Sequence, residues 1–131
     1  MQVRGFSLIE LFIVIGIVSI LNLALFPKFK SLRTSAKSMS AKSTARSIAI
    51  ILEQYYFLNQ TYPSDVNGDV RMVLDSLVDD KLLEEIPINP FTGQMYSGAD
   101  STGKIIYTLV DSTSYALVGY GDGNRDVIFR F

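Results

Sequence analysis

Glu10 is the side chain whose surroundings most need a chemical explanation. It lies in an apolar run, Phe6 to Phe26, that contains no other charged residue. A charged side chain inside a membrane helix costs about 2.5–3.5 kcal/mol on insertion scales. Because buried charges persist where they are paired, we expect a cation to compensate the Glu10 carboxylate.

Oxygen-bearing side chains form a second group with possible chemistry. They occupy alternating positions in two short segments: Asp122, Asn124 and Asp126, and again Asp65, Asn67 and Asp69. Calcium loops begin with this spacing, although neither segment continues as a complete EF-hand. The sequence establishes no cofactor; calcium is the one candidate, and an ordinary Asp/Asn/Gly turn is the alternative for both segments.

The composition excludes several kinds of chemistry. The chain has no Cys and no His, which rules out disulfides, thiol or histidine catalysis and the usual zinc sites. No catalytic constellation is visible, so we expect a protein that is not an enzyme. A basic stretch without interleaved aromatic residues does not favour nucleic-acid binding.

The apolar run itself has the length of a membrane span. Its 21 residues make a helix of about 31 Å, against a hydrocarbon core of about 30 Å. A cleaved secretory signal is the alternative, but its apolar segment has about 7–15 residues and precedes a small-residue cleavage site. Pro27 to Lys30 offers no such site, which favours a retained transmembrane helix.

The N-terminus resembles that of type IV prepilins and of the pseudopilins of type II secretion. The resemblance rests on a short leader with Arg4 that ends in Gly5, then Phe6, Glu10 and the late Pro27. It implies that a prepilin peptidase cuts after Gly5 and methylates the Phe6 amine. It also implies that an inner-membrane machinery assembles the subunit into a helical homo-oligomeric filament.

This processing would supply the missing cation. The new amine of Phe6 lies one helical turn from Glu10 in its own chain, and a neighbouring subunit could present the same amine. We hypothesise that this salt bridge sets the stagger of incoming subunits; the alternative is a protonated or snorkelling Glu10. Gly16 and Pro27 are predicted sites where the helix kinks or loosens.

Residues 28–59 read as the amphipathic half of the same helix, with apolar steps of three and four. A flexible linker is the alternative for its Ser/Ala/Lys-rich start. Charge separates along the chain: six bases and no acid lie between Leu11 and Leu52, whereas twelve acids and five bases follow from Glu53. We hypothesise that basic stems meet acidic heads of neighbours; binding of Lys28, Lys30 and Arg33 to anionic lipid is the alternative.

Residues 60–131 are predicted to form a globular head. A helical turn or two is expected within 70–84, an irregular crossing follows, and period-two patterns at 104–110, 113–120 and 126–131 predict a β-meander. The expected fold class is α+β and pilin-like: a long N-terminal helix packed against an antiparallel sheet of about three strands. The domains are a leader (1–5), an apolar half-helix (6–27), an amphipathic half-helix (28–59) and the head.

Three functions are compatible with this organisation. The favoured one is a type IV pilin that moves from the inner membrane into a surface filament used in adhesion or motility. The first alternative is a major pseudopilin of type II secretion, which would remain in the periplasm. The second is a membrane-tethered monomer with a small binding head.

Overall fold

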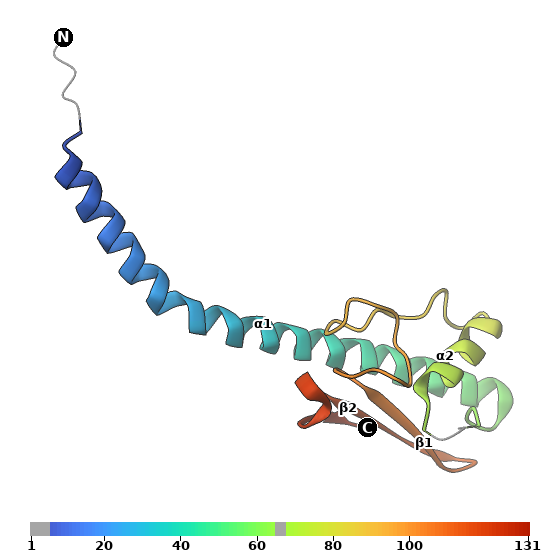
Figure 1. Ribbon diagram of the computed structural model, residues 1–131. Helices are drawn as coiled ribbons and strands as arrows, with labels where there is room; N and C mark the ends of the chain where they lie inside the picture. The colour runs from blue at the N-terminus through green and yellow to red at the C-terminus, as the bar shows by residue number, and fades with distance from the viewer. Residues whose placement is uncertain (1–5, 65–67) are drawn as a thin grey trace. The chain divides into compact units, whose positions relative to one another are not determined.

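A long N-terminal helix is the largest element of the protein. The computed structural model describes residues 6–64 and 68–131, and helix α1 runs from Leu8 to Asn59 (Figure 1). It ends where Gln60 adopts a left-handed conformation, with φ of 57°, and donates its N–H to the Tyr56 carbonyl. This is a common way to satisfy the last carbonyls of a helix. The chain divides into two compact units, one up to Ser35 and one from Ala36 onward.

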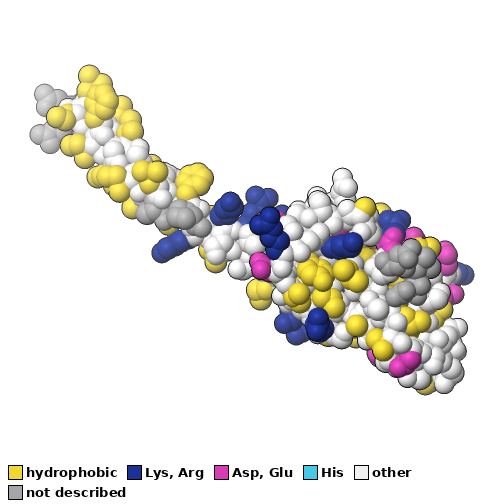
Figure 2. Space-filling view, turned by 60° about the horizontal axis from the view of Figure 1, so that its bottom comes forward, with side chains coloured by type: hydrophobic (Ala, Val, Ile, Leu, Met, Phe, Trp, Pro, Cys, Tyr) yellow, Lys and Arg dark blue, Asp and Glu magenta, His cyan; other side chains and the backbone are white. Residues whose placement is uncertain are grey.

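The first unit contains the apolar part of α1. An 18-residue window has a mean hydropathy of 2.6 and none of it is buried, so the helix has the length and composition to cross a membrane. Its large apolar side chains from Phe6 to Phe26 are 47% to 79% exposed. Figure 2 shows hydrophobic side chains along this segment and Lys and Arg side chains beginning where it ends. The helix therefore exposes apolar surface on every side.

Polar side chains inside this segment bond to their own helix. Ser19 Oγ donates to the Ile15 carbonyl and Asn22 Nδ2 donates to the Val18 carbonyl, each at 2.7 Å. Such bonds one turn back satisfy the side chains without a partner helix. Pro27 lies within α1, where it has no N–H to give to the preceding turn.

In the second unit, α1 buries a narrow stripe against the head. Ala41, Ala45, Ile48 and Leu52 are almost completely buried and follow one another at steps of four, three and four residues. This is the period of one helix face. The predicted amphipathic packing of this part of the helix is thus present.

Helix α2 spans Val70–Asp79, nearly three turns where one or two were expected. Asp69 caps it, because its Oδ1 accepts the N–H of Arg71 at 2.8 Å, as side chains at this position commonly do. The predicted apolar face is buried at Val70, Val73, Leu74 and Leu77.

The C-terminal third forms a three-stranded antiparallel meander in the order β1-β2-β3 (Figure 1). The strands are β1 (Ile105–Asp111), β2 (Ser114–Tyr120) and β3 (Val127–Arg130). These bounds agree with the predicted strands to within one or two residues. A short 3-10 helix, η1, at Asp122–Asn124 connects β2 to β3.

One face of the sheet closes the core of the head. Tyr107 pairs with Leu117 and Gly119 with Phe129 across the ladders. The side chains of Tyr107, Leu117 and Phe129 join Leu52 in one buried cluster. Gly119 is required by Phe129, since a Cβ at this position would lie 2.0 Å from the phenyl ring. The expected α+β, pilin-like fold is confirmed.

The alternation of buried and exposed side chains expected at residues 126–131 is only partly present. Phe129 is buried, whereas Val127 and Phe131 are 53% and 41% exposed. Val127 is the first residue of β3 and Phe131 directly follows the strand, so both lie at the ends of the short strand at the edge of the sheet.

Substitution of Leu52 should separate core packing from surface effects. Leu52→Ala removes a fully buried side chain and is expected to lower the free energy of unfolding by about 2–5 kcal/mol. Ile50→Ala, two residues away and 69% exposed, should change it by less than about 0.5 kcal/mol. Urea unfolding of the full-length protein in detergent measures both, and equal losses would contradict the assigned core face.

Candidate functional site

Glu10 lies in the first turn of α1 and is exposed. Phe6 and Ser7 precede the helix, and the first turn closes where the Leu11 N–H meets the Ser7 carbonyl at 3.2 Å. Phe6 is thus four residues from Glu10, although the predicted cleavage partner Gly5 lies outside the described residues. Within residues 6–64 and 68–131, Glu10 has no basic partner, so its pairing with an amine stays a hypothesis.

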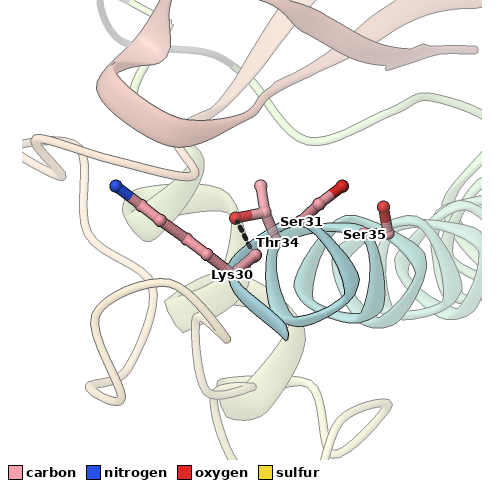
Figure 3. Close-up of a pocket in the computed structure, with 4 residues that line it drawn as sticks. All are labelled: Lys30, Ser31, Thr34 and Ser35. Atoms are coloured by element: carbon pink, nitrogen blue, oxygen red, sulfur yellow. Dashed lines mark hydrogen bonds between the residues drawn. The ribbon is translucent and has the colours of Figure 1, made fainter. Parts of the chain in front are cut away.

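A shallow hollow of about 400 Å³ follows the apolar segment, lined by Lys30, Ser31, Thr34 and Ser35 (Figure 3). The Thr34 hydroxyl is already used, because it donates to the Lys30 carbonyl at 3.2 Å. Figure 3 shows the Lys30 ammonium extending away from the three hydroxyl groups. The polar groups do not converge on a common point, so the hollow offers no built binding site.

Lys37 contacts another segment of the second unit through its ammonium group. Its ammonium donates to the Phe91 carbonyl at 3.2 Å and lies 5.8 Å from the centre of the Phe91 ring. This distance is within the range of a cation–π contact. Lys37 thereby ties the helix to the irregular crossing between α2 and β1.

That crossing is held by a buried amide. Asn89 is fully buried; its Nδ2 donates to the Thr102 carbonyl and its Oδ1 accepts the Phe91 N–H, both at 2.9 Å. Gly103, with φ of 66°, is required here, since a Cβ would lie 2.6 Å from Asn89 Oδ1. Asn89 therefore connects the irregular crossing to the segment that precedes β1.

Asn124 ties a second pair of loops. Its Oδ1 accepts the Lys104 N–H at 3.0 Å and its Nδ2 donates to the Asp100 carbonyl at 2.9 Å. Its backbone is left-handed, with φ of 53°, a conformation that Asn tolerates better than most residues. Asn124 thus fixes η1 against the segment that leads into β1.

The predicted calcium ligands have different surroundings. Asp122 and Asp126 flank Asn124 and expose their carboxylates. Asp69 is engaged as the cap of α2, and Asp65 and Asn67 lie outside the described residues. In the described part of the chain, no three acidic, His or Cys side chains gather in a metal-binding group. Calcium binding stays a prediction for both segments.

Four tyrosines form a contiguous aromatic cluster in the second unit. Tyr62 stacks on Tyr56 and meets Tyr115 edge-on, both with ring centroids 4.7 Å apart, and Tyr115 stacks on Tyr107 at 5.8 Å. Burial, together with the hydrogen bond that Tyr62 donates to Glu53, raises the pKa of Tyr62 to about 12. The cluster joins the end of α1 to the sheet.

Sequence reasoning placed the helix, the sheet and Glu10 but missed the two structural asparagines. Sequence reasoning assigns Asn124 only the role of a candidate calcium ligand and assigns no role to Asn89. The Asn89-Pro90 pair was a usable signal, since Asn in a turn often bonds the backbone two residues ahead, as Asn89 does.

A long apolar helix with a single acid in its first turn, joined to a small antiparallel sheet, defines a pilin-like subunit. Type II secretion system core protein G of Pseudomonas aeruginosa is 31% identical over 98 residues, which cover 69% of this chain and 69% of that protein. No protein-family model matches, and no solved structure matches. The chain belongs to the family of type IV pilins and type II secretion pseudopilins.

Proposed function

We propose that this chain is a structural subunit that polymerises through its N-terminal helix into a pilin-like filament, and that it acts as a major pseudopilin of a type II secretion system. The carrying observation is the apolar segment of α1, whose side chains are exposed around the whole helix. Such a surface is stable only in lipid or against neighbouring subunits. Burial contributes roughly 25 cal/mol per Å² of apolar surface removed from water.

The proposed sequence of events starts in the inner membrane. A prepilin peptidase removes residues 1–5 and methylates the Phe6 amine, and the assembly machinery then moves the helix from lipid into the filament core. Glu10 would leave the bilayer interface paired with a Phe6 amine, which lowers the cost of keeping its charge away from water. The role is structural rather than enzymatic.

Similarity to core protein G supports the pseudopilin over the type IV pilin. A pseudopilus remains in the periplasm, whereas a type IV pilus extends from the cell surface and serves adhesion or motility. The pilin interpretation is the alternative, and the same N-terminal chemistry supports it. The location of the filament separates the two.

Intact-mass spectrometry of the protein from sheared surface filaments and from the cell envelope tests this proposal. We expect a form that lacks Met1–Gly5, is one methyl heavier and stays in the envelope fraction. The same processed form in the sheared fraction would identify a pilin. Retention of residues 1–5 in both fractions would overturn the filament proposal and favour the tethered monomer.

We also propose that calcium binds the loop Asp122–Asp126. Two exposed carboxylates on either side of the fixed Asn124 provide the oxygen ligands that calcium prefers. Asn124 Oδ1 already accepts one N–H, and its second lone pair stays available. Bound calcium would stiffen the connection between β2 and β3 beside the Asn124 contacts.

The calcium proposal predicts a metal-dependent rise in thermal stability. Full-length protein in detergent should gain about 2.7 kcal/mol when free calcium exceeds its dissociation constant about 100-fold, and magnesium should have a smaller effect. The double variant Asp122→Asn, Asp126→Asn should lose this gain, whereas Glu84→Gln, an exposed acid elsewhere, should keep it. An unchanged melting temperature in the parent protein would contradict the proposal.

A further inference from the structure

The outer face of α1 in the second unit carries an apolar stripe with bases beside it. Met39, Arg46, Ile50 and Phe57 lie within about 40° of one another around the helix, at about 100° per residue. Met39, Ile50 and Phe57 are 74%, 69% and 78% exposed. This outer face is opposite the buried stripe of Ala41, Ala45, Ile48 and Leu52, so the protein's own core does not cover it.

The bases on this side of the helix are also unused by the subunit. Lys42 and Arg46 are exposed, and in the part of the chain that the structure describes neither has an acidic partner. Lys37 differs, because it is held by Phe91. An apolar stripe with two free cations fits a surface that is apolar and acidic.

Helix α2 presents such a surface. Met72, Asp75 and Asp79 lie on its exposed side, with Met72 48% exposed. The exposed acids Asp80, Glu84 and Glu85 follow the helix along the chain. Asp75 is already paired with Arg71 at 3.0 Å, which leaves Asp79 and the acids after it free within the described residues.

The spacing of apolar and charged groups on the outer face of α1 also matches that on the exposed side of α2. At about 1.5 Å per residue, Met72 and Asp79 are about 10.5 Å apart along α2. Along α1, Ile50 lies about 6 Å from Arg46 and about 12 Å from Lys42. A methionine seated on Ile50 therefore places Asp79 within reach of the two long basic side chains.

The two faces cannot meet within one molecule. The buried stripe of α1 and the buried face of α2 contribute to the same core cluster, so their exposed faces are turned away from that core and from each other. A contact between them joins two copies through different patches. Contacts of this kind propagate into open helical assemblies unless the rotation closes a ring.

From this complementarity we infer that the outer face of α1, centred on Arg46, Ile50 and Phe57, docks on the α2 ridge, Met72 and Asp79, of a second copy of this chain. The inference rests on the proposed filament function and specifies a contact between heads within it. It adds to the N-terminal helix packing a second, charge-dependent interaction that fixes the register of neighbouring heads.

Cysteine cross-linking tests this contact directly, because the chain has no Cys of its own. The double variant Ile50→Cys, Met72→Cys in assembled filaments should give a ladder of oligomers with a short thiol cross-linker. The control Ile50→Cys, Val110→Cys uses a site near the end of β1 that is more exposed than Met72, at 64% against 48%, and should give no ladder. A ladder from the control alone, or filaments without a ladder from the first pair, would overturn the inference.

Charge reversal provides a second readout on the same filaments. Arg46→Glu should reduce filament yield several-fold, and Arg46→Glu with Asp79→Arg should restore it, whereas Arg130→Glu, an exposed base on β3, should leave it unchanged. No rescue by the double variant would contradict the pairing. If the parent protein forms no filaments by electron microscopy, the proposed function itself fails, which distinguishes that result from failure of this contact.

Discussion

The carboxylate of Glu10 is the constraint on which assembly depends, because it is the one charge in the segment Phe6 to Phe26, which otherwise suits an apolar environment. Lipid solvates the apolar side chains but not the charge, so in the membrane we expect Glu10 to lie near the interface or to pair with the Phe6 amine of its own chain. A filament in which Glu10 meets a processed amine satisfies both the charge and the apolar surface. We therefore expect the pairing of Glu10 to lower the free energy of the assembled state relative to the membrane-embedded state.

The two units of the chain are stabilised in different ways. In the first unit, the residues whose burial the structure describes are all exposed, so the stability of this segment depends on its surroundings. The second buries one face of α1, α2 and the sheet in a single cluster and cross-connects its long loops through Asn89 and Asn124. A head held together in this way needs no disulfide, which agrees with a chain without cysteine.

Much of this fold follows from the sequence because strong periodicities specify it. Steps of three and four place Ala45, Ile48 and Leu52 on one face, and alternation locates three strands to within one or two residues. Helix α2 begins at Val70 as expected, but it is longer than the one or two turns that its sequence suggested. The roles of Asn89 and Asn124 depend on backbone groups 13 and 20 residues away, and such distant partners leave no local pattern.

Filament yield of Glu10→Gln tests the central claim most directly, because glutamine keeps the size of the side chain and removes its charge. The account predicts normal leader removal and N-methylation by intact mass, with filament yield reduced at least tenfold and partly recovered in Glu10→Asp. Processing acts as an internal control, since an unprocessed variant could not assemble for an unrelated reason. Normal filaments from processed Glu10→Gln protein would contradict the account.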